Sequence, residues 1–291
     1  MPAGTATAVP SRPLRRRLQG AEAVTPTSFN RCNLPPWVIA SRRFDEDPRP
    51  IEVQGVRREN RFLFDLLDHV DDPDERVRRF DDWMDVRFQL HQWREQATAG
   101  ARRSLRNGYL RFLRGWGMDA SSVEGAVLKG WVEGSLGIPP TFHREPLGPR
   151  DGRAFSRYAA DRARGHAWTS AIDAQLDLLY TFTQYELARR RPGERWLTLW
   201  RGQNDLPAHE VVETLGRREW VLRMNNLCSF TDDRERAWEF GDVVLEARIG
   251  VGDVVTNLLN HFMEDGRGFL AEHGKNAPIK RAAKSQEIAE I

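Results

Sequence analysis

The residues best suited to chemistry are an arginine and a serine, each at the end of a predicted strand in the last third of the chain. The two motifs are Arg201-Gly202 and Ser229-Phe230-Thr231. A guanidinium group presents a planar fork of N–H donors that fits a phosphate and keeps its charge inside a pocket. Arg201 therefore predicts a site for a phosphate-bearing ligand. The alternative is an arginine at a strand end that pairs with a surface acid such as Asp205.

Short strands must position these residues. The runs 196–200, 220–224 and 243–249 are rich in aromatic and β-branched residues and are bounded by polar turns, which is typical of strands. Residues 243–249 alternate apolar and charged side chains, so one face of this strand is expected to be buried. Residues 232–240 are predicted to form a short helix with Ala237 and Phe240 on one side. The last third therefore carries a sheet.

The first two thirds are predicted to be mainly helical. Apolar residues recur at helical spacing from about residue 58 to 116, and again from Ile172 to a stop at 191–193. Asp72 before Pro73 is a cap followed by proline at the first helical position, which starts a new helix. Ser121 and Glu124 have the spacing of a capping box. The expected helix faces contain Leu63, Leu66, Leu67 and Val70, then Val77, Phe80, Met84 and Phe88, then Leu105, Tyr109, Phe112 and Trp116.

The fold class that follows is α+β, with a mainly helical N-terminal portion and a C-terminal mixed β core. Parallel β-α-β alternation is missing, which argues against a doubly wound fold. Residues 1–28 are rich in Pro, Thr, Ser and Arg and are expected to be a flexible tail. Residues 29–192 are the helical portion, and 193–255 carry the core strands in one integrated domain with it. Residues 256–291 are expected to be a divergent C-terminus.

Composition excludes several classes of protein. The chain has 291 residues with 40% hydrophobic content, enough for one large core, so a disordered or fibrous protein is excluded. The net charge of +2 gives no domain-wide basic field for nucleic acid. No segment has the roughly 20 apolar residues of a spanning helix. Cys32 and Cys228 are expected to be reduced thiols, which indicates a cytoplasmic protein.

Common catalytic and metal-binding motifs are missing. The sequence contains no GxGxxG, GxxxxGK[ST], HExxH, CxxC or GxSxG pattern. The seven histidines are scattered without metal-ligand spacing, so no metal is expected.

The order of the motifs resembles the ADP-ribosyltransferase fold of the Arg-Ser-Glu type. In that superfamily an Arg-Gly pair ends the first core strand and holds the phosphate or ribose of NAD, and a Ser-x-Thr/Ser strand supports the nicotinamide pocket. The sequence Ser229-Phe230-Thr231 followed by Ala237, Phe240 and Gly241 is similar to its pattern. The resemblance implies NAD binding by Arg201, Gly202, Ser229, Phe230 and Thr231, with the Ser229 hydroxyl bound to ribose or to a catalytic carboxylate.

A second resemblance covers residues 29 to about 255 and is more specific. Four stretches carry it: residues 29–44, 55–62, 199–205 and 225–231. Together they are similar to the dinitrogenase reductase ADP-ribosyltransferase family. This resemblance implies transfer of ADP-ribose from NAD to an arginine of dinitrogenase reductase, the nitrogenase iron protein, which switches nitrogen fixation off. The helical portion would then recognise that protein, or a regulatory PII-type signal protein. Taken alone, Trp37 after Pro35-Pro36 indicates a core tryptophan at a rigid turn.

The catalytic carboxylate is the weakest part of the pattern. Arginine-modifying members of the superfamily carry Glu-x-Glu on a late strand, and this sequence has none after Ser229. Glu272 lies at a more usual distance beyond Ser229, but residues 273–276 do not indicate a strand. Glu287 has the better local pattern near the end of the chain, so both are candidates.

Two alternatives to a transferase follow from the sequence. The missing Glu-x-Glu favours a catalytically impaired protein that binds NAD or a partner. A nucleic-acid-associated helical protein would use arginines that instead fall around a helix surface, which favours a solvated face: Arg102, Arg103, Arg106, Arg111 and Arg114.

Overall fold

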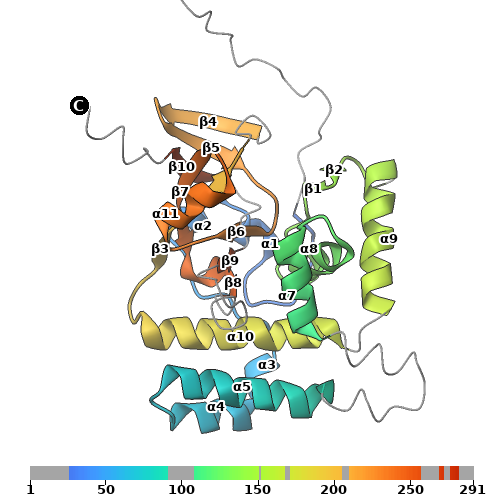
Figure 1. Ribbon diagram of the computed structural model, residues 1–291, viewed down its shortest axis with the longest axis vertical. Coiled ribbons are helices and arrows are strands. Elements are labelled where there is room, and N and C mark those ends of the chain that lie inside the picture. Colours follow the sequence, from blue (N-terminus) through green and yellow to red (C-terminus); the bar gives the residue numbers. More distant parts are fainter. Residues whose placement is uncertain are drawn as a thin grey trace, which may run out of the picture.

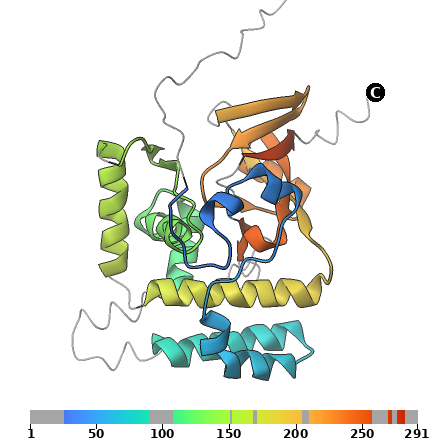
Figure 2. The same cartoon turned by 180° about the vertical axis from the view of Figure 1, so that it is seen from behind.

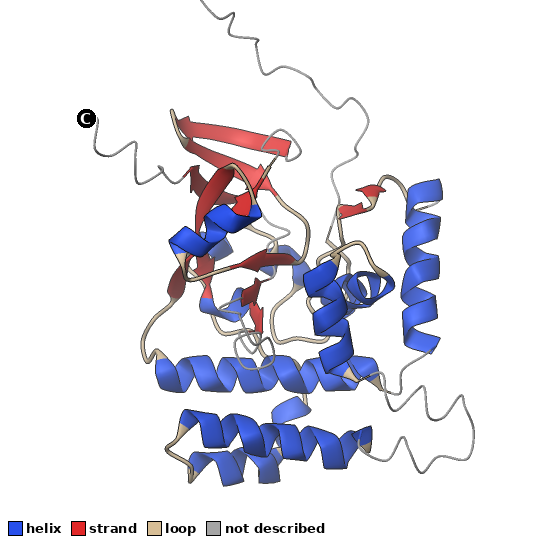
Figure 3. Cartoon of the chain, in the orientation of Figure 1, coloured by secondary structure: helices blue, strands red, loops and turns tan. Residues whose placement is uncertain are grey.

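A computed structural model describes residues 26–90, 108–150, 152–167, 171–204, 210–256, 269–271 and 276–281. Several predictions therefore lie outside the described residues: the tail up to residue 25, Leu105, Asp205, and the two candidate catalytic glutamates, Glu272 and Glu287. Figure 3 shows that the strands, apart from one short hairpin, gather in one part of the molecule and that the long helices lie below and beside them.

Several of the described helices pack against one central helix, α10 (Ile172–Arg190). The described helices are α1 (Pro36–Ile39), α2 (Arg42–Glu46), α3 (Val56–Glu59), α4 (Arg61–Asp68), α5 (Pro73–Phe88), α7 (Tyr109–Met118), α8 (Val123–Ser135), α9 (Arg153–Ala167), α10 and α11 (Arg234–Ala237), with 3₁₀ turns η3 (Trp238–Phe240) and η4 (Val251–Asp253). Most of α10 is buried on all sides, as expected for a helix without a polar face. It lies between the sheets and the α4–α5 pair (Figure 1), and the view from behind shows the same order (Figure 2).

Local signals set the start and the buried face of α5. The Asp72 side chain accepts a hydrogen bond from the N–H of Asp74, and Pro73 occupies the first turn, as predicted. Val77, Phe80 and Met84 are buried, and the Phe80 ring stacks on Phe182 of α10 with centroids 4.0 Å apart. The predicted helical face is confirmed there, because packing on α10 removes it from water.

The strands form two principal sheets and one short hairpin. The five-stranded sheet has the order β3-β7-β10-β5-β4, and the three-stranded sheet has the order β6-β9-β8. Their bounds are β3 (Trp196–Gln203), β4 (Glu210–Gly216), β5 (Glu219–Arg223), β6 (Cys228–Phe230), β7 (Val243–Gly250), β8 (Val254–Thr256), β9 (Phe269–Ala271) and β10 (Asn276–Arg281), with the hairpin of β1 (Phe142–His143) and β2 (Glu145–Pro146).

The α+β class is confirmed, and the three strands predicted at 196–200, 220–224 and 243–249 are β3, β5 and β7. All pairings between the described strands are antiparallel, so the expected mixed β core is not found in that part of the chain. Leu245, Ala247 and Ile249 are buried on the predicted face of β7.

Two strands come from the segment expected to diverge. β9 pairs with β6, and β10 lies between β7 and β5 in the middle of the larger sheet. Pro278 in β10 pairs with Val221 of β5, and the pairing with β7 begins only at Ile279. Because proline has no N–H to donate, it is tolerated here where one neighbour is missing.

Four local predictions are wrong in detail. The cap of α8 is Ser122, one residue after the predicted Ser121, and its side chain accepts from the N–H of Gly125. Phe240 is exposed because the helix after Ala237 tightens into a 3₁₀ turn that rotates its side chain outward. Trp37 is 63% exposed, because α1 is a single turn that buries only Pro36 and Ile39. Leu66 is also largely exposed, on the outer face of α4.

Candidate active site

Arg201 and Ser229 lie side by side because β3 and β6 are joined where they end. The backbone N–H of Trp200 donates to the carbonyl of Thr231, and the N–H of Thr231 donates to the carbonyl of Trp200, both at 2.8 Å. Arg201 Nη1 donates to the carbonyl oxygen of Ser229 at 2.8 Å. The structure thus brings together two motifs that are 28 residues apart in the sequence.

Arg201 keeps donors that no described residue uses. Its Nη1 is bound to the Ser229 carbonyl, whereas its Nε is buried and has no hydrogen-bond partner among the described residues. A buried N–H without a partner is costly, and such groups are rare in folded proteins. Arg201 forms no ion pair within the described residues, and the alternative partner Asp205 lies outside them. The guanidinium is therefore fixed at one end and able to bind an anion at the other.

Glycine is required next to Arg201 because α11 lies directly on the end of β3. A Cβ atom on Gly202 would be 1.8 Å from the carbonyl oxygen of Ala237. Gly241 has a φ of +156°, and a Cβ atom there would be 2.2 Å from the carbonyl carbon of Gln203. These contacts hold the turn at 237–241 against the strand that carries Arg201, which fixes the depth of the site.

Ser229 is held by a residue that the sequence did not mark as functional. Trp116 Nε1 donates to Ser229 Oγ at 2.9 Å. A serine hydroxyl that accepts one hydrogen bond still has its own proton to donate. Trp116 lies on α7, so the helical portion contributes directly to the site. Helical periodicity placed Trp116 on a buried face, but it carried no information on where the indole N–H would reach.

The contacts of Phe230 and Thr231 are those of residues that support the fold. Phe230 is buried in the core between the sheets, with Leu199 and Leu245 in the same cluster. Thr231 Oγ1 accepts from the N–H of Asp233, and Asp233 rather than Thr231 caps α11. These two residues therefore build the turn after β6.

A buried lysine lies behind Trp116. The Nζ of Lys129 is 5.6 Å from the Trp116 ring centroid, donates to the carbonyl of Phe142 at 2.8 Å, and is 3.5 Å from His143 Nδ1. Burial lowers the pKa of Lys129 from its ordinary 10.5 to about 8. Burial also lowers the pKa of His143, and the Lys129 charge lowers it further, although Asp161 opposes the shift. An isolated lysine in an apolar helix is the one sign of this cluster in the sequence.

Cys228 is not equipped to act as a nucleophile. Burial raises the pKa of its thiol, although Arg201 and Lys129 oppose that shift. A thiol needs to be a thiolate to attack or to bind a metal, so Cys228 packs as an apolar residue. Cys32 and Cys228 are both free thiols, as predicted.

The candidate catalytic carboxylates, Glu272 and Glu287, stay predictions. β9 pairs with β6 so that Leu270 is opposite Ser229 and Ala271 is opposite Cys228. Glu272 is the next residue in the sequence after this strand. The described part of the chain contains no group of three His, Cys, Asp or Glu side chains that could hold a metal ion. Within that same part, no helix is long and apolar enough to cross a membrane.

Comparison with known proteins agrees with the arrangement of these motifs. The family described as dinitrogenase reductase ADP-ribosyltransferase (DRAT) matches residues 29–270. The chain belongs to this family. It is 41% identical over 254 residues to the NAD(+)--dinitrogen-reductase ADP-D-ribosyltransferase of Rhodospirillum rubrum, a match that covers 85% of this chain and 92% of that protein. No solved structure matches the chain.

The DRAT family match includes Arg201, Ser229 and Trp116 and ends at residue 270, within β9. It thus covers the helical portion and both motifs of the site, and it stops before Glu272 and Glu287.

Proposed function

We propose that this chain transfers ADP-ribose from NAD to an arginine of dinitrogenase reductase and thereby regulates nitrogen fixation. The observation that carries the proposal is Arg201, which is fixed by the Ser229 carbonyl and retains a buried Nε without a described partner. The relative from R. rubrum is named for this reaction and shares most of its length with this chain.

Each side chain of the site has a role in this proposal. NAD supplies the ADP-ribosyl group, and cleavage of its bond to nicotinamide passes through an oxocarbenium-like centre. Arg201 binds a phosphate of the pyrophosphate group through Nε and its remaining Nη2, in the bidentate manner that guanidinium groups favour. Ser229, held by Trp116, donates its hydroxyl proton to a ribose hydroxyl or to the catalytic carboxylate. Gly202 allows the turn at 237–241 to close over the site.

A carboxylate completes the proposed reaction. Nicotinamide leaves neutral with the electron pair of its bond to ribose, and the acceptor guanidino nitrogen forms the new bond to the same ribose carbon. A protonated guanidinium is a poor nucleophile, so a carboxylate must orient it and take its proton. We propose Glu272 or Glu287 for this role. Glu272 directly follows the strand that pairs with β6, which favours it.

The second candidate function is an impaired transferase that binds NAD or a partner protein. It is favoured by one observation, the absence of a Glu-x-Glu sequence after Ser229. The two candidates share Arg201 and Ser229 and differ only in turnover.

Two further proposals concern the location of the protein in the cell and its regulation. Two free, buried cysteines in 291 residues support a location in the cytoplasm, where thiols stay reduced. A PII-type signal protein is proposed as a regulator, supported only by the resemblance of the helical portion to this family.

The test is transfer of labelled ADP-ribose from NAD to purified dinitrogenase reductase, followed by intact mass. Arg201→Lys keeps the charge but loses the fork of donors, so we expect the KM for NAD to rise about 10- to 150-fold, as for loss of a charged hydrogen bond. Arg248→Lys is the matched control, because Arg248 is exposed on β7 and packs only over the Trp196 ring.

The glutamates are tested in the same assay. Glu272→Gln and Glu287→Gln separate the two candidates, and loss of turnover in one variant with unchanged NAD binding identifies the carboxylate. Saturable NAD binding by the wild type without any transfer would establish the impaired protein instead. An Arg201→Lys variant with the wild-type KM for NAD would show that Arg201 does not bind it.

A further inference from the structure

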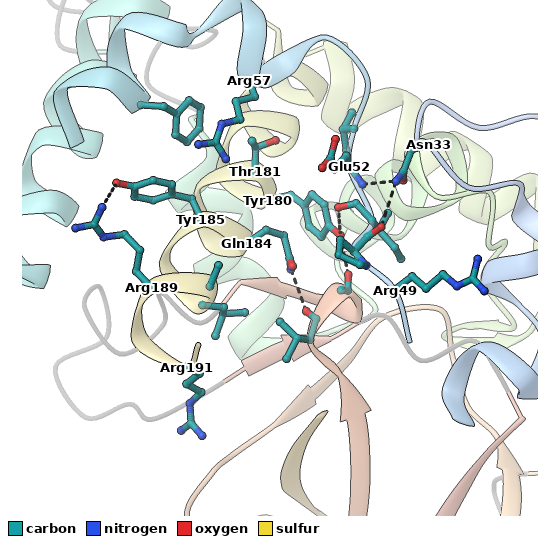
Figure 4. Close-up of a pocket in the computed structure, with 18 of the residues that line it drawn as sticks. Asn33, Arg49, Glu52, Arg57, Tyr180, Thr181, Gln184, Tyr185, Arg189 and Arg191 are labelled. Carbon is teal, nitrogen blue, oxygen red and sulfur yellow. Dashed lines mark hydrogen bonds between the residues drawn. The ribbon is translucent and has the colours of Figure 1, made fainter. Parts of the chain in front are cut away.

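A large groove lies away from Arg201. It has a volume of about 1010 Å³, and its floor is the C-terminal half of α10, with Tyr180, Gln184 and Tyr185. Its walls are residues 48–61 and the η4 turn (Figure 4). Arg195 lines the groove directly before β3 begins, and Arg201 follows six residues later. At 3.2–3.4 Å per residue of strand, Arg195 and Arg201 are about 20 Å apart.

The groove is lined by seven arginines and by four acids, Glu52, Asp65, Asp68 and Glu194. Arg49, Arg57, Arg58 and Arg61 line it and form no ion pair within the described residues. Three further arginines on the opposite wall are already paired, each with one carboxylate: Arg189 with Asp68, Arg191 with Glu194, and Arg195 with Asp47. The seven arginines outnumber the four acids of the lining, so the groove carries a net positive charge that favours an anionic partner.

Two aromatic rings orient the guanidinium group of Arg57. Its guanidinium carbon is 5.2 Å from the ring centroid of Phe64 and 5.7 Å from that of Tyr185, which is the geometry of a cation–π interaction. It donates no hydrogen bond to a described residue. The arginine is therefore oriented by two rings at the floor of the groove, with its N–H groups available.

Exposed aromatic side chains lie on segments next to the groove, although they are not part of its lining. Phe62 on α4 is 64% exposed, and the Arg61 guanidinium lies 4.7 Å from its ring centroid. Beyond the opposite wall, residues 28–37 and Gln54 form a second hollow of about 420 Å³, which shares Asn33 and Gln54 with the groove. Phe29 and Trp37 line this hollow and are 75% and 63% exposed. We call Phe29, Trp37 and Phe62 the aromatic rim.

The combination fits a protein better than a small anion. Exposed aromatic residues and arginines are the side chains that most often carry the binding energy of protein interfaces. A phosphate compound in the groove would leave the aromatic rim in water. The unpaired arginines are also spread along two helices and a loop, which suits several carboxylates on one segment.

We propose that the groove and its aromatic rim dock an acidic segment of the protein substrate, while its acceptor arginine is modified at the Arg201 site. This inference rests on the proposed function. A folded protein substrate easily spans 20 Å, so one molecule can contact both places. The groove then sets affinity for the protein substrate without taking part in the transfer.

The test compares transfer to dinitrogenase reductase with transfer to a small acceptor, arginine methyl ester. Arg58→Glu/Arg61→Glu reverses two exposed charges of the groove, and Arg217→Glu/Arg218→Glu makes the same charge change at the exposed turn between β4 and β5. We expect the groove variant to raise the KM for dinitrogenase reductase about tenfold or more, as for loss of an interface hot spot. Its KM for NAD and its rate with arginine methyl ester should equal those of the wild type, and the control variant should match the wild type throughout.

A direct measurement of binding tests the same proposal without depending on turnover. Equilibrium binding of dinitrogenase reductase should weaken by the same factor in the groove variant, and Phe62→Ala should weaken it as well. Equal affinity of wild type and groove variant would overturn the proposal. An equal loss of rate with arginine methyl ester would also overturn it, because it would show that the variant affects the active site. Binding of pyrophosphate in the groove, with unchanged affinity for the protein substrate, would overturn it as well. A wild type that binds the protein but transfers to neither acceptor would contradict the proposed function alone.

Discussion

Lys129 offers a test of the buried cluster behind the active site that does not depend on any ligand. Its amino group is almost completely buried and faces Trp116, the residue that holds Ser229. We expect Lys129→Met to remove a pH dependence of stability that the wild type has. Methionine fills a similar volume, and the Phe142 carbonyl that loses the lysine still accepts from Asn225 Nδ2 at 2.9 Å.

The sign and the size follow from the pKa. Burial lowers the pKa of Lys129 from 10.5 to about 8 in the folded protein, so between these values the unfolded chain binds more protons. Stability of the wild type relative to the variant therefore rises as the pH increases from 8 towards 10.5. The shift corresponds to about 3 kcal/mol in total, of which about 2 kcal/mol is gained by pH 9.5. Burial lowers the pKa of His143 and raises the pKa of Cys228, and in both cases it favours the neutral side chain.

The assay is urea unfolding of wild type and Lys129→Met at pH 7.0, 8.0, 9.0 and 9.5. Taking the difference between the two proteins removes the contribution of the shared ionisable groups that do not interact with Lys129. A difference that stays constant within about 0.5 kcal/mol would refute the reasoning, because the folded amine would then titrate as it does in the unfolded chain. A difference that falls with pH would show that the cluster stabilises the charge.

The remaining predictions test contacts of the site. Gly202→Ala should reduce the free energy of unfolding by about 3 kcal/mol or more, because its Cβ would be 1.8 Å from the Ala237 carbonyl oxygen. Gly148→Ala is the control. A Cβ there meets nothing within 4 Å, so this variant should change the free energy of unfolding little. Equal stability of these two variants would contradict the close packing of α11 on β3. In a double-mutant cycle, Trp116→Phe and Ser229→Ala should show a coupling of about 1 kcal/mol in stability, and strictly additive effects would mean that the hydrogen bond is not formed.

The sequence predicted features whose causes are local. Asp72 followed by Pro73 sets the start of α5 without help from the rest of the chain, and the alternation in β7 indicates its buried face directly. The fold class and the strand that presents Arg201 follow from such patterns. Trp37 shows the limit, since its residue type suggested a core position and the single turn of α1 leaves it exposed.

Features that depend on distant partners could not be predicted. β10 contains Pro278, Lys280 and Arg281, an unfavourable composition for a central strand, and it becomes one because β5 and β7 pair with its two edges. The link from Trp116 to Ser229 joins residues 113 positions apart. No pattern in a single sequence specifies which indole reaches which hydroxyl.

The proposed docking groove and the proposed NAD site lie near opposite ends of one strand, β3. The helical portion is expected to recognise the protein substrate, and it supplies most of the groove, through residues 48–61 and the end of α10, with residues 193–195 directly before β3. Arg201 lies at the other end of the same strand, about 20 Å away. Because β3 is paired along its full length with β7, it holds the two sites at a fixed separation. A protein whose acidic segment and arginine match that separation would be modified faster than other proteins, although both sites would bind its parts only moderately.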